Sequence, residues 1–221
     1  MIKGIIYDMD DLMIDSSPLH QRAGEFVLQK YGHSLEEIPE DIRSRFFGKR
    51  VVDIVEEMVD FFKLDVDPKI FFKERDAVFL DLVKKELQTL PGLVQSLQFF
   101  KNNNYKIIVA SSGTKEFIDI VLDKFKIHKY YDAIVSGDEV SAGKPDPEPF
   151  LLATKKLGLK PEECVVLEDS ANGVEAAKKA GCKCISIPYK TKFKQDVSKA
   201  DLVLSSLEDI NIDVMKLIFG K

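Results

Sequence analysis

The sequence predicts an α/β protein with a doubly wound, parallel, Rossmann-like sheet and an inserted all-α cap domain. Short β-branched runs recur after helical stretches, which is the rhythm of β-α-β units. Runs such as residues 107–110 (IIVA) are apolar without alternation, as in parallel strands that helices cover on both faces. A third observation is the long segment between the first two runs, which exceeds what one crossover helix needs.

The elements follow in order from these patterns. The strands are predicted at residues 4–7, 106–110, 133–136, 164–167, 184–187 and 202–204. Between the first two strands, apolar positions recur at helical spacing, as around Val55 and around Val83. We therefore predict a helical cap at residues 16–88 and a core made of residues 1–15 and 89–221. The turn at Pro91-Gly92 should begin the next core helix.

The composition is that of an ordinary soluble protein with one core and a smaller insertion: 221 residues, 45% of them hydrophobic, and a formal charge of -5. Because the charge is spread along the chain, it offers no argument for a nucleic acid or an anionic membrane as partner. No apolar stretch approaches the roughly 18 residues that span a bilayer, and no secretory leader is recognisable. We expect a cytoplasmic protein, monomeric by default.

Cysteine usage fits a reducing compartment. Cys164, Cys182 and Cys184 make an odd number in a chain too large to need disulfide staples. Cys182 and Cys184 should share one side of a strand, but no second Cys or His pair is nearby, which argues against a zinc site. Buried apolar packing is the better interpretation.

Carboxylates follow the first predicted strand directly, at Asp8, Asp10 and Asp11. An apolar run that ends in acids places them at the carboxyl edge of a central strand, where open α/β sheets bind their ligands. Acids this close repel one another unless a cation or protons relieve them. Taken alone, the pattern is equally compatible with a solvated strand end or a helix N-cap.

Two further strand ends carry groups suited to a phosphate. After the second strand come Ser111 and Ser112, whose hydroxyls and backbone N–H groups at a helix start suit a phosphoryl oxygen, although Ser is also a common N-cap. Lys144 lies between Gly143 and Pro145 in a loop, where a fixed ammonium can neutralise phosphate or the acids. This is no nucleotide-binding loop, because Pro145 stands where Ser or Thr is required.

The fourth motif is the acid pair Glu168-Asp169, which also follows an apolar strand and precedes a helix start. Together with Asp8 and Asp10 it supplies oxygen ligands for a hard cation, and an all-oxygen set favours magnesium over zinc. Singly, each pair could serve as capping acids. Four strand ends with compatible chemistry, in this order, indicate one site for phosphate chemistry.

These motifs resemble the haloacid dehalogenase (HAD) superfamily, in its subfamily I branch of phosphatases with a helical cap. The resemblance covers nearly the whole chain and consists, in order, of residues 8–13 (DMDDLM), Ser111, Lys144 and the pair Glu168-Asp169. The chain length and the polar segment at residues 15–20, which leads into the cap, look like the β-phosphoglucomutase and sugar-phosphate phosphatase group.

The resemblance implies roles for these residues. Asp8 would attack phosphorus and become an aspartyl phosphate, and Asp10 would act as the acid and base, with its carboxyl initially protonated. Mg²⁺ would be the cofactor, held by Asp8, the Asp10 backbone carbonyl and Asp169, with Glu168 binding directly or through water. The phosphoryl group would be held by Ser111, Ser112 and Lys144.

One position departs from the family pattern. Asp11 stands where the family usually has Gly, and it adds a side chain where close approach to phosphate is expected. Asp tolerates left-handed backbone geometry better than most residues, so the fold should survive. A carboxylate facing the site would weaken phosphate binding, whereas one facing a hinge or a lysine would change little. We favour the second orientation because every other motif is intact.

Three functions remain open. A mutase needs cap residues that grip a distal phosphate, and His20 occupies a position where such mutases carry His; the position three residues after Gly48 is Val51, where they carry Arg. This mismatch favours hydrolysis of a small phosphate monoester, such as a sugar or polyol phosphate. A phosphate-binding protein that has lost turnover through Asp11 is the third alternative. The candidate cap contacts are His20, Lys49, Arg50 and Arg75.

Overall fold

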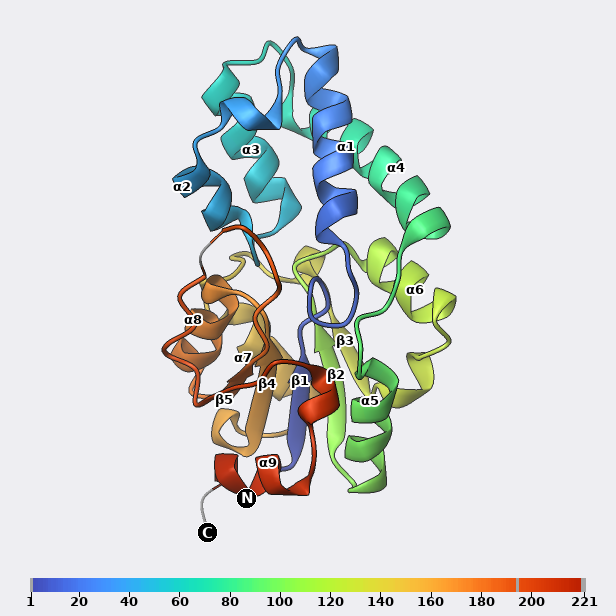
Figure 1. Ribbon diagram of the computed structural model, residues 1–221, viewed down its shortest axis with the longest axis vertical. Helices are drawn as coiled ribbons and strands as arrows, with labels where there is room; N and C mark the ends of the chain where they lie inside the picture. Colours follow the sequence, from blue (N-terminus) through green and yellow to red (C-terminus); the bar gives the residue numbers. More distant parts are fainter. Residues whose placement is uncertain (1, 194, 220–221) are drawn as a thin grey trace.

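Parallel strands form the centre of the protein in the computed structural model (Figure 1). The strands are β1 (Gly4–Tyr7), β2 (Lys106–Ala110), β3 (Ala133–Val135), β4 (Cys164–Glu168), β5 (Lys183–Ser186) and β6 (Leu202–Val203). They make one six-stranded sheet in the order β3-β2-β1-β4-β5-β6, and every pairing is parallel. The predicted Rossmann-like α/β fold is confirmed. The structure describes residues 2–193 and 195–219; residues 1, 194, 220 and 221 of the predicted core lie outside the described residues.

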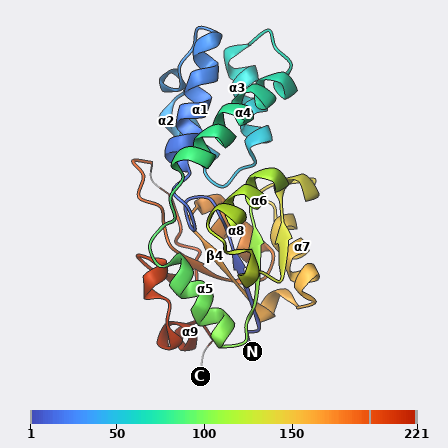
Figure 2. The same cartoon turned by 90° about the vertical axis from the view of Figure 1, so that its right-hand side faces the viewer.

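Helices cover both faces of the sheet, as the unalternating strands require (Figure 2). One face packs against α5 (Leu93–Asn102), α6 (Lys115–Lys124) and α9 (Ile212–Phe219), and the other against α7 (Glu148–Leu157) and α8 (Ala171–Lys179). Successive strand residues point to opposite faces, so Ile5 belongs to the first apolar cluster and Ile6 to the second. Gly92 precedes α5 in a left-handed conformation, in agreement with the predicted turn.

The segment between β1 and α5 is largely helical and lies beyond the carboxyl edge of the sheet (Figure 1). It consists of α1 (Ser17–Lys30), α2 (Glu40–Arg43), α3 (Val51–Phe62) and α4 (Pro68–Glu86). Val55, Met58 and Phe71 belong to an apolar cluster that the segment forms by itself. Ile14 pairs with Thr89 where the chain leaves and rejoins the core. We call residues 17–86 the cap; the predicted domain boundaries at residues 16 and 88 stay a prediction.

Short 3₁₀ turns connect these elements. They are η1 (Leu35–Glu37), η2 (Ser44–Phe46), η3 (His128–Tyr130), η4 (Gly137–Glu139), η5 (Pro161–Glu163) and η6 (Leu207–Asp209). The three cysteines are buried and free, and all lie in the second apolar cluster, which confirms that they serve packing. Among the described residues, no helix combines the length and the apolar character needed to cross a membrane.

The strand order brings the sequence motifs together. β1 lies between β2 and β4, with Tyr7 paired to Val109 on one side and to Leu167 on the other. Because the strands are parallel and in this register, their carboxyl ends share one edge of the sheet. The residues that follow β1 and β2 and those that end β4 must therefore meet at that edge, on the side of the cap.

Candidate active site

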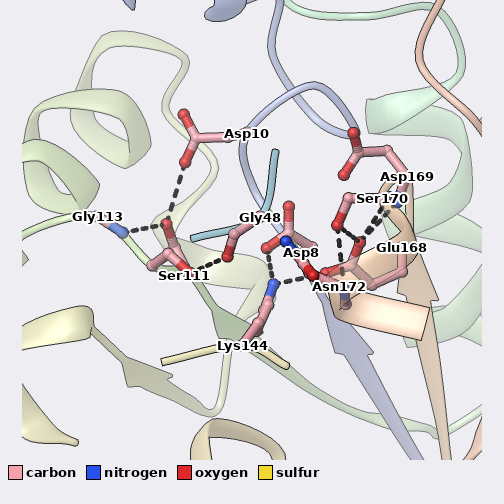
Figure 3. Close-up of polar contacts among 12 residues, drawn as sticks. Asp8, Asp10, Gly48, Ser111, Gly113, Lys144, Glu168, Asp169, Ser170 and Asn172 are labelled. Atoms are coloured by element: carbon pink, nitrogen blue, oxygen red, sulfur yellow. Dashed lines mark hydrogen bonds and ion pairs between the residues drawn. The ribbon is translucent and has the colours of Figure 1, made fainter. Parts of the chain in front are cut away.

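A buried ion-pair cluster occupies the carboxyl edge of the sheet (Figure 3). The Lys144 ammonium contacts Oδ1 of Asp8, and it lies 2.5 Å from Oε1 of Glu168. The Lys144 side chain is 0% exposed. Burial alone would lower the pKa of Lys144, but the charges of Asp8 and Glu168 outweigh burial and hold that pKa above its usual range. The ammonium is thus a fixed positive charge beside Asp8.

Glu168 is held by the start of the following helix. Its Oε2 accepts hydrogen bonds from the backbone N–H groups of Asp169 and Ser170, at 2.8 and 2.9 Å, and from the Ser170 hydroxyl at 3.0 Å. A Cβ on Gly173 would lie 1.8 Å from Glu168 Oε1, so only glycine permits this approach. Since Oε1 contacts Lys144, both oxygens of Glu168 have protein partners. The arrangement suits a residue that positions Lys144.

A group of oxygen ligands lies beside this ion pair. Asp8, Glu168 and Asp169 each offer one carboxylate oxygen, and these atoms lie within 4.8 Å of one another. Burial and mutual repulsion raise the pKa values of Asp8 and Asp169 well above their usual range, although Lys144 opposes the shift. A buried, all-oxygen cluster of acids fits a hard divalent cation such as Mg²⁺. The carboxylate of Asp10 is outside this group.

Asp10 points away from the ligand group, toward the cap hinge and β2 (Figure 3). Its Oδ1 accepts a hydrogen bond from the Ser16 hydroxyl at 2.7 Å and lies 3.2 Å from His20 Nε2, while Oδ2 accepts from the Ser111 hydroxyl at 3.2 Å. Burial raises the pKa of Asp10, but these interactions outweigh burial and bring the pKa below its usual value. This differs from the expected protonated starting state: without substrate, Asp10 is an ionised acceptor.

The Arg75 guanidinium fixes the tautomer of His20. The imidazole stacks on Phe79 with ring centroids 4.0 Å apart, and Arg75 Nη2 donates to its Nδ1. Because a guanidinium only donates, Nδ1 must accept, so Nε2 carries the proton and donates to Asp10. Burial and the Arg75 charge also lower the pKa of His20. Burial lowers the pKa of Arg75 to about 10, which still leaves it charged at neutral pH.

The two predicted phosphate-binding serines, Ser111 and Ser112, have different partners. The Ser111 hydroxyl accepts from Gly113 N–H at 3.0 Å and donates to Asp10, so it stays in the site. Ser112 instead donates to the carbonyl oxygen of Gly48 at 2.8 Å, which ties the core to the cap. Gly48 has φ 78°, and a Cβ there would lie 2.5 Å from the hydroxyl of Ser170. Only glycine allows the cap to approach this closely.

Asp11 faces the hinge, as predicted. Its backbone is left-handed, with φ 58°, and its carboxylate accepts from Ser17 N–H at 2.9 Å and from the Ser17 hydroxyl. Burial, followed by the charge of Asp10, raises the pKa of Asp11 to about 7, against the lowering effect of the Ser17 hydrogen bonds. The side chain thus caps the start of α1, and Asp11 also lines the cavity described below.

A cavity of about 860 Å³ lies between the sheet edge and the cap. Asp8, Asp10 and Asp169 line it on the core side. The predicted cap contacts also line it: His20, Lys49, Arg50 and Arg75. Its size is within the range of small-molecule sites, roughly 300–1,000 Å³. The structure therefore brings the predicted catalytic residues Asp8 and Asp10 and the predicted cap residues to one cavity that is open to solvent on one side.

Two of those cap cations are already paired. Lys49 bonds Glu57, and Arg50 makes a forked contact with Asp53, at 2.7 and 2.8 Å. Arg50 also donates to the carbonyl oxygen of Val140 at 3.0 Å, so it joins the cap to the core. These contacts indicate structural roles for Lys49 and Arg50, whereas Arg75 acts on His20.

Sequence reasoning missed other residues of the site. The Ser170 hydroxyl supports Glu168, and Asn172 Nδ2 donates to the carbonyl oxygens of Phe47 and Arg45, at 2.8 and 3.1 Å. Both belong to the polar run directly after the acid pair, which was an available signal. Arg43 also lines the cavity, and no local pattern marks it.

Comparisons with known proteins agree with this geometry. The model of the family "haloacid dehalogenase-like hydrolase" matches residues 5–187. A phosphorylated carbohydrates phosphatase of Thermotoga maritima is 35% identical over 188 residues, covering 83% of this chain and 84% of that protein. The fructose-1-phosphate phosphatase YqaB of Escherichia coli is 27% identical over 186 residues, or 83% and 95% of the two chains.

A solved structure is similar throughout. CbbY from Rhodobacter sphaeroides, crystallised in complex with phosphate, superposes with a TM-score of 0.81 at 25% identity, over 95% of this chain and 96% of the other. The phosphatases among the relatives support the prediction of a phosphoric monoester hydrolase. By its family match over most of its length, and as its motifs predict, this chain belongs to the haloacid dehalogenase-like hydrolase family.

Proposed function

We propose that the protein is a Mg²⁺-dependent phosphatase that hydrolyses a small phosphate monoester, a sugar or polyol phosphate, through an aspartyl phosphate. The observation that carries the proposal is the buried carboxylate of Asp8, placed against the Lys144 ammonium and next to Asp169 at one side of the cavity. The names of the Thermotoga and Escherichia relatives, which act on phosphorylated carbohydrates, support the substrate class.

In the proposed first step, an oxygen of Asp8 attacks phosphorus and the ester P–O bond breaks. Lys144 contacts Oδ1 of Asp8, which leaves Oδ2 for the attack. The ammonium also offsets the charge that gathers between the carboxylate and the phosphoryl oxygens. Glu168 contributes by holding Lys144 in place. The leaving alkoxide then needs a proton, and Asp10 is the acid on the cap side of the site.

Asp10 must therefore gain a proton that the unliganded site does not hold. The negative charge of a bound phosphate dianion raises the pKa of a neighbouring carboxylate, which favours the protonated acid in the complex. Hydrogen bonds from His20 and Ser16 to Oδ1 keep the carboxyl oriented. After the alkoxide leaves, Asp10 is again a base and takes a proton from the water that hydrolyses the aspartyl phosphate.

The metal role is proposed for Asp8 and Asp169, together with the backbone carbonyl of Asp10. Mg²⁺ held there would neutralise charge on the phosphoryl oxygens. Glu168 is the less suitable ligand of the three clustered acids, because both of its oxygens have partners in the protein.

A phosphosugar mutase is the second candidate. It is favoured by the contact of His20 with Asp10, since a cap residue that holds the acid could make proton transfer depend on cap closure. The mutase alternative requires conversion of glucose 1-phosphate into glucose 6-phosphate, primed by a bisphosphate, with little free phosphate. The phosphatase alternative requires free phosphate as the main product.

The decisive experiment measures phosphate release from a panel of sugar and polyol phosphates, with and without Mg²⁺, for the wild type and Asp8→Asn. Asp213→Asn removes an exposed carboxylate in α9 and serves as the control. We expect release that needs Mg²⁺, falls by at least about a thousandfold in Asp8→Asn and is unchanged in the control. Binding of phosphate without any release from the panel would overturn the proposal and favour a protein without turnover.

A further inference from the structure

Arg43 is a cavity-lining cation without an ionic partner. It ends α2, lines the cavity that also holds Asp8, and makes no ion pair with any described residue. Its Nε atom is buried without a hydrogen-bond partner. A buried donor without a partner on a charged group is costly to the folded protein. The other arginines and lysines that line the cavity from the cap each have an acceptor, as Lys49 has in Glu57.

A loop of the core holds Arg43 in place. The segment after β5 reaches from the sheet to the cap beside α2 (Figures 1 and 2). The Arg43 guanidinium carbon lies 5.5 Å from the centroid of the Phe193 ring, and Phe193 packs on Phe47 of the cap with centroids 5.8 Å apart. Gln195 donates to the carbonyl oxygen of Ser44 at 3.1 Å. The guanidinium is thus supported on an aromatic face between two parts of the chain.

A second cation comes from the same loop. Lys192 lines the cavity, and its nearest carboxylate oxygen, on Glu40, is 3.9 Å away, beyond hydrogen-bond distance. Lys192 is 63% exposed at its side chain, so it can move toward a ligand. An aromatic platform with an unpaired guanidinium and an exposed ammonium is suited to bind an anion, because a guanidinium can donate two parallel hydrogen bonds to it.

We propose that Arg43, assisted by Lys192, is a specificity-determining residue that binds a second anionic group of the substrate, a phosphate or a carboxylate. This inference rests on the proposed function, since the first phosphate is taken to lie at Asp8. The preferred substrates are then small phosphate monoesters with a second negative group at the far end, and neutral sugar or polyol monophosphates are poorer substrates.

The test compares matched substrate pairs. Fructose 1,6-bisphosphate is compared with fructose 1-phosphate, and phosphoglycolate with 2-hydroxyethyl phosphate, so that each pair differs by one anionic group. We expect wild-type kcat/KM to favour the anionic member of at least one pair by about tenfold or more, and Arg43→Gln to remove most of that preference, because a hydrogen bond to a charged group contributes about ten- to hundredfold. The two pairs distinguish a second phosphate from a carboxylate.

Arg45→Gln is the matched control. Arg45 lies two residues further along the same segment, is exposed, and pairs with Asp41 instead of lining the cavity. Arg45→Gln should leave the ratio of kcat/KM values within both substrate pairs unchanged. Equal kcat/KM within both pairs for the wild type, or a proportional loss on both members of a pair in Arg43→Gln, would contradict the inference, because the second result marks a structural role only.

A binding measurement separates this inference from the proposed function. In the Asp8→Asn protein, calorimetry gives the Kd of fructose 1,6-bisphosphate and of inorganic phosphate without turnover. Adding Arg43→Gln to this protein should raise the Kd of fructose 1,6-bisphosphate about tenfold or more and leave the Kd of inorganic phosphate unchanged. Absence of turnover in the wild type would contradict the proposed phosphatase function. An unchanged affinity for the bisphosphate in the Arg43→Gln variant would contradict the proposed role of Arg43.

Discussion

At the scale of single residues, the site depends on how closely Glu168 approaches the backbone of α8. Gly173 leaves room for the carboxylate, which in turn fixes the ammonium of Lys144 beside Asp8. The positive charge at the nucleophile is therefore positioned through a chain of contacts that begins at a glycine with no chemistry of its own. Small changes at Gly173 should reach Asp8 through these contacts.

Gly173→Ala tests this dependence. The added Cβ would lie 1.8 Å from Glu168 Oε1, so the carboxylate must move and take Lys144 with it. We expect kcat with a phosphate monoester to fall at least about tenfold, since a misplaced charge in a site of this kind costs several kcal/mol. Gly24→Ala is the control for folding: its Cβ would meet only Leu35, at 3.6 Å, and the change should raise Tm slightly. Unchanged kcat in Gly173→Ala would refute the chain of contacts.

Asp11 supports a second residue-scale prediction, about stability. Its carboxylate caps α1, and its φ of 58° strains any residue with a Cβ other than Asn or Asp. Asp11→Gly removes the cap alone and should lower the free energy of unfolding by about 1 kcal/mol. Asp11→Ala adds roughly 1–2 kcal/mol of backbone strain. Urea unfolding measures the free energy of unfolding of both variants, and we expect Asp11→Ala to be the less stable. Equal losses of stability in the two variants would exclude backbone strain at this position.

At the scale of elements, the cap is held on the core by a few backbone acceptors in residues 45–48. Asn172 donates to the carbonyl oxygens of Phe47 and Arg45, and Ser112 donates to that of Gly48. Asn172 stands near the start of α8, directly after the acid pair that ends β4, and Ser112 stands in the loop after β2, next to Ser111. Closure of the cap and geometry of the site are therefore coupled at the same strand ends.

Removing one of these donors should weaken substrate capture. We expect Asn172→Ala to raise KM about two- to tenfold, as expected for the loss of one or two hydrogen bonds, with little change in kcat. Asn103→Ala removes a comparable amide-to-carbonyl bond at the end of α5, away from the cap, and should leave KM unchanged. Steady-state kinetics with one substrate suffice, and a fall in kcat at constant KM would instead place Asn172 in the chemical step.

Sequence patterns predict elements well where the pattern is local. The predicted strands agree with β1 to β6 within one residue at each end, because each is an apolar run bounded by polar residues. Asp8, Lys144 and Asp169 come together because parallel strands align their carboxyl ends. Ser112 bonds the cap, and Arg43 packs on Phe193 in the loop after β5. Both contacts depend on how the cap packs against the core, and no local sequence periodicity predicts that packing.

At the scale of the whole molecule, the fold carries a cluster of buried acids that one lysine only partly compensates. Asp8, Glu168 and Asp169 are nearly or fully buried, and Lys144 contacts two of them. Burial of these groups, together with the repulsion among them, opposes folding, and both effects raise the pKa values of Asp8 and Asp169. A cation that binds the folded chain alone should therefore raise global stability as well as support catalysis.

Thermal unfolding with and without Mg²⁺ measures this coupling. At a concentration a hundred times Kd the cation adds about 2.7 kcal/mol, which raises Tm by about 5–10 °C for a chain of this length. Asp169→Asn removes one repelling charge and one ligand, so its metal-free Tm should equal or exceed that of the wild type and its response to Mg²⁺ should be lost. Asp213→Asn removes an exposed charge and should keep the full response. If Mg²⁺ supports turnover but does not change the Tm of the wild type, the metal binds only together with substrate. The acid cluster would then not be a metal site of the free protein.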